Sequence, residues 1–171
     1  KKKNLKKKKL VSIGTFHYSR RYQNVLIGFL KKFDLNLDFF LKDKKLKNQL
    51  LKTNKIFIKK KIDNKKKLIS MLQFYKFGVI FYPINSIASD LCSPLKIHDY
   101  LLADLIIISL FKNKSLVELK KKFPKLIYFY NESLSLDNLF LDKDYFLQKK
   151  NYFQIKKKEM MLFDQIMLNK F

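Results

Sequence analysis

Short apolar runs alternate with amphipathic stretches along this chain. The runs are rich in β-branched and aromatic residues, a pattern typical of strands that are covered on both faces of a sheet. We predict six strands, at residues 10–15, 35–41, 56–59, 78–82, 105–109 and 126–130. Between them, apolar side chains recur at helical spacing, most clearly over residues 22–30 and 68–75.

Polar residues that precede the helical periods mark the expected helix starts. Asp63 is suited to cap the helix that follows the third strand. Ser115 with Glu118 has the spacing of a capping box, which predicts a short helix there. Ser93 is a good N-cap, and Pro94 fits the first helical position, where its missing N–H costs nothing.

The last part of the chain is predicted to be helical, with a short helix over residues 133–140 and a long one over residues 155–171. Strands and helices alternate before that point. This order predicts an α/β domain, a parallel sheet of about six strands with helices on both faces. We therefore expect three parts: a basic linker at residues 1–9, the α/β domain at residues 10–154, and a C-terminal helix at residues 155–171.

The chain is strongly basic, with 38 basic and 14 acidic residues among 171 and a formal net charge of +24. Such a charge indicates either a nucleic-acid or anionic-membrane partner, or biased base composition in the coding sequence. Arg20 and Arg21 are the only arginines, and every other basic residue is lysine. Proteins that read bases use arginine, whose fork matches guanine edges. The pattern thus favours biased composition, and we expect no nucleic-acid partner.

Cysteine usage and hydropathy restrict the remaining classes of protein. Cys92 is the single cysteine, which excludes a disulfide framework or a cysteine-based zinc site within one chain. No apolar run reaches membrane-spanning length. We therefore expect a cytoplasmic protein. The chain opens on KKKNLKKKK without a starting Met, so we also expect a fragment or an excised domain.

The segment from Ser93 to Ser109, SPLKIHDYLLADLIIIS, places a helix start at the carboxyl end of a strand. Open α/β sheets bind ligands at such positions. The segment resembles SPxKxxEYxAxGxPVV of those GT-B glycosyltransferases that belong to the broad group of retaining, nucleotide-sugar-dependent enzymes. The matched residues are Ser93, Pro94, Lys96, Asp99, Tyr100 and Ala103. The chain departs from the family pattern at two places. Asp104-Leu105-Ile106 stands where Gly-Lys-Pro is usual. Leu91 stands where members often have a further acid, and Asp90 is only its neighbour.

A second segment, SIGTFHYSRRYQN at residues 12–24, resembles the family's VGxxxxxKG stretch after the first strand. Gly14 occupies the turn, and Arg20 or Arg21 stands where the family has Lys. The gap length leaves the choice between the two arginines open. A guanidinium offers paired donors to phosphate oxygens. The alternative is a solvated arginine pair at a helix start.

The resemblance implies a Rossmann-like fold, the C-terminal, donor-binding half of a GT-B enzyme. It implies that Asp99 accepts hydrogen bonds from the ribose hydroxyls, whereas spacing alone also fits an exposed acid paired with Lys96. Ser93 and the amides of Leu95 and Lys96 would face the diphosphate, although Pro94 itself has no N–H to donate. The resemblance identifies no catalytic residue.

The function implied by the resemblance is sugar transfer from a nucleotide-sugar donor, such as a UDP- or GDP-sugar, in cell-envelope polysaccharide or glycolipid synthesis. It implies no metal and no cofactor. An N-terminal GT-B domain would bind most of the acceptor, so this chain alone should turn over poorly. A peripheral position at the inner face of the membrane is compatible with a lipid-linked acceptor.

Two alternatives remain open from the sequence. One is a basic α/β module that binds nucleic acid or an anionic membrane, with the lysines of residues 155–171 lying on the lipid. The other is a degenerate, non-catalytic glycosyltransferase-like domain, since the Gly and the further acid are lost. His98 and His17 are separate and make no metal set with one cysteine. We expect His98 to be a packing or surface residue.

Overall fold

The computed structural model describes residues 9–14, 20–41, 54–81, 96–130, 134–139 and 141–168. Within these ranges the chain forms a six-stranded sheet in which every pairing is parallel. The strands are β1 (Lys9–Ile13), β2 (Asn36–Leu41), β3 (Ile56–Lys60), β4 (Phe77–Ile80), β5 (Ile106–Ser109) and β6 (Ile127–Phe129). The helices are α1 (Arg20–Lys32), α3 (Lys65–Leu72), α5 (Lys96–Leu102), α6 (Lys114–Lys122) and α7 (Lys143–Leu168), with a 3-10 turn η1 (Leu136–Asn138). The predicted fold class is confirmed.

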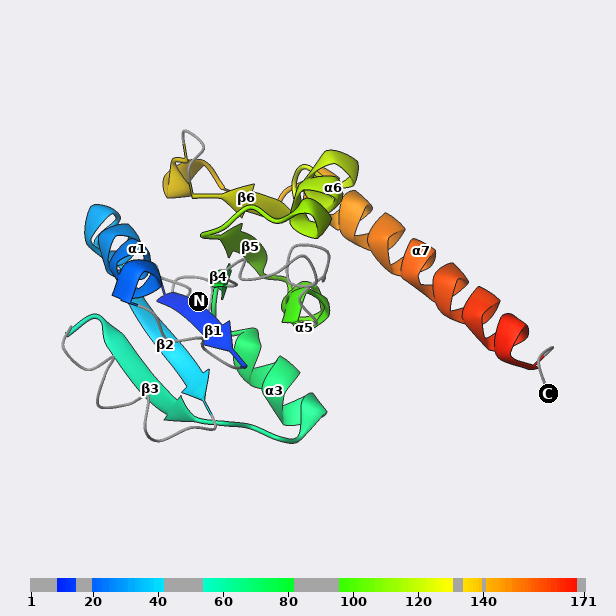
Figure 1. Ribbon diagram of the computed structural model, residues 1–171, viewed down its shortest axis with the longest axis horizontal. Helices are drawn as coiled ribbons and strands as arrows, with labels where there is room; N and C mark the ends of the chain where they lie inside the picture. Colours follow the sequence, from blue (N-terminus) through cyan, green and yellow to red (C-terminus); the bar gives the residue numbers. More distant parts are fainter. Residues whose placement is uncertain are drawn as a thin grey trace.

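The spatial order of the strands is β3-β2-β1-β4-β5-β6 (Figure 1). The chain therefore runs outward to one side from β1 and then to the other side from β4. Right-handed crossovers place α1 on one face of the sheet and α3, α5 and α6 on the other. At the carboxyl ends of β1 and β4 the connections diverge to opposite faces, and such a switch point is where open α/β sheets bind ligands.

The two central strands after the switch point form the middle of the core. All four residues of β4 and all four of β5 are buried. The neighbouring strand β1 continues this apolar layer. Its Leu10 lies opposite Leu37 of β2 on one side and Phe77 of β4 on the other. Such all-apolar runs need cover on both faces, which the flanking helices supply.

Two helices of the α/β core end in the same way, on an aspartate in the left-handed conformation. Asp34 follows α1 with φ +47°, and Asp104 follows α5 with φ +58°. In each case the next residue donates its N–H back across the last turn, from Leu35 to the carbonyl of Leu30 at 2.9 Å and from Leu105 to that of Tyr100 at 2.9 Å. This is the Schellman ending, which satisfies carbonyls left free by the helix.

The helix before β4 begins one residue later than predicted. The cap is Asn64, whose side-chain oxygen accepts from the N–H of Lys67 at 3.0 Å. Asp63 instead pairs with Lys61. Both residue types cap helices well, so the sequence could not choose between neighbours.

The capping box predicted at Ser115 and Glu118 is wrong. Asn113 caps α6, accepting from the N–H of Leu116 at 2.8 Å. Ser115 lies inside the first turn, and Glu118 pairs with Lys121 at 2.8 Å on the exposed face.

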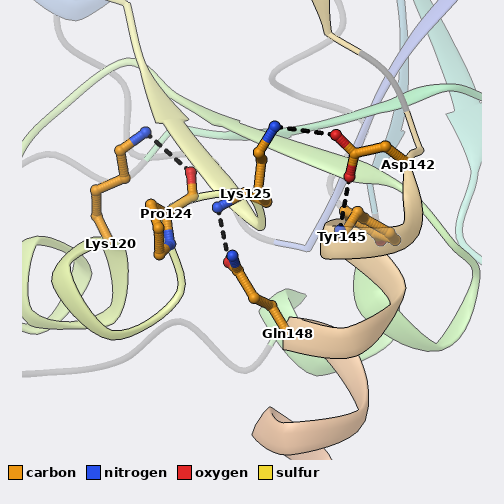
Figure 2. A network of polar contacts seen from close by, with 6 residues as sticks. All are labelled: Lys120, Pro124, Lys125, Asp142, Tyr145 and Gln148. Carbon is orange, nitrogen blue, oxygen red and sulfur yellow. Dashed lines mark hydrogen bonds and ion pairs between the residues drawn. The ribbon is translucent and has the colours of Figure 1, made fainter.

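The terminal helix begins twelve residues before the predicted start, at Lys143. Of the short helix predicted over residues 133–140, the described residues 134–139 contain the 3-10 turn η1. Figure 2 shows how its first turn is held against β6. Asp142 accepts from the N–H of Tyr145 at 2.7 Å and from the Lys125 ammonium at 2.9 Å. Gln148 accepts from the N–H of Lys125 at 2.8 Å, and the buried Tyr145 hydroxyl donates to the carbonyl of Leu105 at 3.0 Å.

Beyond this anchor, α7 leaves the body of the molecule (Figure 1). Ile155, Met160 and Met161 are exposed along it, with fractions of 43%, 66% and 54%. The helix is continuous across residue 155. The division of the chain into three parts stays a prediction.

Candidate functional site

Four polar or flexible positions from three elements meet at the carboxyl edge of the sheet, at the switch point. Gly14 follows β1, Lys65 begins α3, and Lys96 and Asp99 lie in the first turn of α5 (Figure 1). We call these four residues the switch-point cluster. Gly14, Lys96 and Asp99 were predicted site residues, whereas Lys65 was not.

Gly14 is the point at which the backbone leaves β1. Its φ of +95° lies in the region that strains any residue with a side chain. Its N–H donates to the carbonyl of Phe40 at 3.3 Å, which fixes the turn against β2. A Cβ at this position would lie 4.0 Å from Cε of Lys96. The side chain of Lys96 therefore borders the turn.

Lys96 is half-buried at the start of α5. Burial lowers the pKa of its ammonium from the usual 10.5 to about 8, because removal from water disfavours the charged form. A partly desolvated ammonium is a strong partner for an anion, since less water competes for it.

Asp99 lies three residues after Lys96, on the same side of α5. Its side chain is only 14% exposed, and its carboxylate pairs with the ammonium of Lys65 across the contact between α3 and α5. The alternative predicted pairing, with Lys96, is not the one that the structure forms. A covered carboxylate and a half-buried ammonium therefore lie one turn of α5 apart at the edge of the sheet.

Tyr100 fixes the position of α5 on the sheet. Its buried hydroxyl accepts from the N–H of Ile13 at 3.1 Å and donates to the carbonyl of Val79 at 3.1 Å. The buried Ser12 hydroxyl also donates to that carbonyl, at 3.2 Å. The last residues of β1 and β4 are thereby tied to the helix that carries Lys96 and Asp99.

His98 lies against α7. Its Nδ1 is 3.3 Å from the hydroxyl of Tyr152, and its ring meets that of Phe153 edge-on at 5.0 Å between centroids. Burial lowers the pKa of His98, although the charge of Asp99 acts in the opposite direction. These contacts are those of a packing residue, as expected.

Known proteins were compared with the chain by sequence and by fold. No protein-family model matches the sequence, and no curated protein matches it. An α,α-trehalose-phosphate synthase (UDP-forming) from Burkholderia vietnamiensis matches in structure with a TM-score of 0.55 and 9% identity, over 93% of this chain and 45% of that one. A trehalose-6-phosphate synthase solved with bisubstrate glycomimetics matches with a TM-score of 0.55 and 11% identity, over 88% of this chain and 41% of that one.

The chain has the fold of a GT-B glycosyltransferase domain. It spans less than half the length of either structural neighbour. The six parallel strands and flanking helices are those of a Rossmann-like unit.

The residue that stands where the resembled segment has Gly is an aspartate in the left-handed conformation. Asp104 stands at that position and adopts the left-handed conformation itself, with φ +58°. Its carboxylate pairs with Lys149 of α7, which adds a contact that glycine could not make. The helix therefore ends in the expected way despite the departure from the family pattern.

Several predicted site residues fall partly or wholly outside the described residues. Arg20 and Arg21 form the first two positions of α1, with only their backbone described. Ser93, Pro94 and Leu95 lie outside the described ranges, as do His17, Asp90, Leu91 and Cys92. Their roles in the GT-B domain stay predictions.

Sequence reasoning missed Lys65. It is the first of three consecutive lysines, and its partner Asp99 is 34 residues away. Nothing local distinguishes it from Lys66 or Lys67, because only the packing of α3 beside α5 selects it.

Among the described residues there is no group of three or more His, Cys, Asp or Glu side chains arranged to hold a metal ion. The same part of the chain has no helix of the length and apolar character needed to span a bilayer.

Proposed function

We propose that this chain is the donor-binding domain of a nucleotide-sugar-dependent glycosyltransferase. The observation that carries the proposal is the switch-point cluster: a glycine turn bordered by Lys96, the half-buried ammonium of that lysine and a covered carboxylate at the carboxyl edge between β1 and β4. Ligands of open α/β sheets bind at this place. A nucleotide sugar carries both an anionic diphosphate and a ribose diol, which match the ammonium and the carboxylate.

Each residue has a distinct proposed role. Lys96 contacts the diphosphate, and Gly14 lets the phosphates approach the backbone because it has no side chain of its own. Asp99 accepts hydrogen bonds from the ribose hydroxyls, since two carboxylate oxygens can accept two donors at once. Arg20 or Arg21 adds charge at the start of α1, and Ser93 with the amides after Pro94 completes the phosphate side.

The proposed reaction moves a glycosyl group. The bond between the anomeric carbon and the diphosphate oxygen breaks, an acceptor hydroxyl bonds to that carbon and loses its proton, and the nucleoside diphosphate leaves. Negative charge grows on the leaving group in the transition state, so fixed cations beside it lower the barrier. In this proposal lysine and arginine supply the charge, and no metal is needed.

The proposal includes a second GT-B domain that binds the acceptor, consistent with a chain that spans 41–45% of its structural neighbours. The donor-binding domain alone should then bind nucleotide but transfer sugar slowly. An acceptor in cell-envelope polysaccharide or glycolipid synthesis, reached at the inner face of the membrane, is the context we propose for the complete enzyme.

Calorimetric titration of the chain with UDP and with GDP tests the proposal. We expect one of them to bind and the Asp99→Asn variant to bind it at least about tenfold more weakly, because a hydrogen bond to a charged group is lost. Asp137→Asn, an exposed acid in η1, is the matched control and should leave affinity unchanged. Absence of binding to either nucleotide, or equal affinity of the Asp99→Asn variant, would overturn the proposal.

A basic binding module is the second candidate, favoured by six exposed lysines within nine residues, at 59–61 and 65–67. It predicts binding to an oligonucleotide or to anionic vesicles that weakens steeply with salt, and indifference to UDP and GDP. Donor binding at one covered site predicts a much shallower salt dependence.

A further inference from the structure

We infer that Lys65 is a positioning residue that holds the Asp99 carboxylate in place for the ribose of a nucleoside diphosphate. The inference rests on the proposed function and adds a residue to the same site. Lys65 is the first residue of α3 and Asp99 belongs to the first turn of α5, so the ion pair joins two helices at the edge of the sheet.

The two side chains differ sharply in exposure. Asp99 is 14% exposed, whereas Lys65 is 60% exposed. A carboxylate that is largely removed from water needs a partner to remain charged at low cost. Lys65 supplies that partner from the solvent side, so its ammonium can change position while the Asp99 carboxylate stays covered.

The pairing leaves acceptor capacity for a ligand. Lys65 contacts Oδ1 of Asp99. An ionised carboxylate has about four acceptor positions on its two oxygens, so one ammonium does not exhaust it. A ribose diol presents two hydroxyl donors side by side, and a carboxylate held in a single orientation can accept from both.

Lys65 also changes the electrostatics of the site. Asp99 lies one turn of helix from Lys96, the proposed diphosphate contact. An uncompensated carboxylate at that distance would repel the phosphates. Pairing with Lys65 offsets this charge, which allows an acid and a diphosphate to occupy one site.

Lys66 provides a matched control. It carries the same charge, lies one position further along α3, and is exposed. Successive helical residues point about 100° apart, so Lys66 does not share the direction of Lys65. A general effect of lysine charge on nucleotide binding would appear equally in Lys65→Met and Lys66→Met.

The test is the ratio of affinities for a ribonucleotide and its 2′-deoxy form, measured by calorimetry with UDP and dUDP and with GDP and dGDP. We expect the wild type to favour the ribonucleotide about tenfold, as for a hydrogen bond to a charged acceptor. The ratio should fall toward one in both Asp99→Asn and Lys65→Met, and remain high in Lys65→Arg and Lys66→Met. In the Asp99→Asn background, Lys65→Met should change the ratio no further.

The outcomes separate the two proposals. Loss of discrimination in Asp99→Asn but not in Lys65→Met overturns the role of Lys65 and leaves the proposed function standing. Tighter binding by Lys65→Met also overturns it, because Lys65 would then be a competitor of the ligand. No nucleotide binding by the wild type, or unchanged discrimination in Asp99→Asn, overturns the ribose assignment and this inference with it.

Discussion

The aromatic ring of Tyr100 lies directly over Gly78 in β4. A Cβ at Gly78 would stand 2.5 Å from Cγ of Tyr100 and 2.6 Å and 2.8 Å from the two Cδ atoms. Atoms do not approach so closely, so the missing side chain is what allows α5 to sit this near the sheet. The distance between helix and sheet in turn sets where Lys96 and Asp99 meet the switch point.

We predict that Gly78→Ala destabilises the domain by about 1–3 kcal/mol or more, because the added methyl overpacks a filled core. Gly28→Ala is the control, since no atom of the described residues lies within 4 Å of a Cβ there. Gly28 is in α1, so its replacement should stabilise by about 0.5–1 kcal/mol through helix propensity. Urea unfolding of both variants measures the free energy of unfolding, which should fall in Gly78→Ala and rise in Gly28→Ala. A neutral Gly78→Ala would show that α5 has room to move.

The hydroxyl of Tyr100 should be needed for stability apart from its ring. Tyr100→Phe keeps the packing over Gly78 but leaves the N–H of Ile13 without this buried acceptor. An unpaired buried donor costs about 1–3 kcal/mol, and we expect a loss of that size in urea unfolding. Far-ultraviolet circular dichroism should be unchanged. A loss below about 0.5 kcal/mol would mean that water replaces the hydroxyl.

Asp104 offers a test of backbone strain at the end of α5. Asp104→Gly and Asp104→Ala both remove the ion pair with Lys149, but only glycine adopts φ +58° without strain. We expect the Gly variant to be more stable than the Ala variant by about 1 kcal/mol, measured by chemical unfolding. At Lys150, an exposed position within α7, the order should reverse, because helix propensity favours Ala. The same order at both sites would contradict the left-handed ending.

The sequence was sufficient to predict the sheet because each strand has a recognisable local pattern. Every residue of β4 and β5 is buried, and short apolar runs of this kind are typical of strands covered on both faces. The helix caps were less certain because Asp63 and Asn64 are neighbours with similar capping ability, and tertiary packing decides between them. The start of α7 was missed for a related reason: Asp142 is held there by Lys125, which is 17 residues away.

The candidate site was predictable only in part. Gly14, Lys96 and Asp99 were found because the resemblance gives them positions within two short segments. The partner of Asp99 was not found, because local spacing favoured Lys96 at i, i+3 while the fold brings Lys65 instead. Pairings between elements depend on the packing of α3 on α5, which no local pattern contains.

Lys96 should give the protein a characteristic response to pH. Burial lowers its pKa to about 8 in the folded state, whereas the unfolded chain keeps the usual 10.5. Between these values the unfolded state binds more protons, so the contribution of Lys96 to the free energy of unfolding rises as pH increases from about 8 to 10.5. Lys96→Met removes the cost of burying the charge and should be more stable than the wild type at pH 7. The difference between the two should shrink as pH rises through this window, and urea unfolding at several pH values measures it.

Binding should respond in the opposite direction, because only the charged ammonium attracts a diphosphate. We expect affinity for UDP or GDP to fall above pH 8 in the wild type and to stay flat in Lys96→Met, with Lys114→Met, an exposed lysine of α6, following the wild type. Parallel pH profiles for wild type and Lys96→Met would remove Lys96 from the phosphate side of the site.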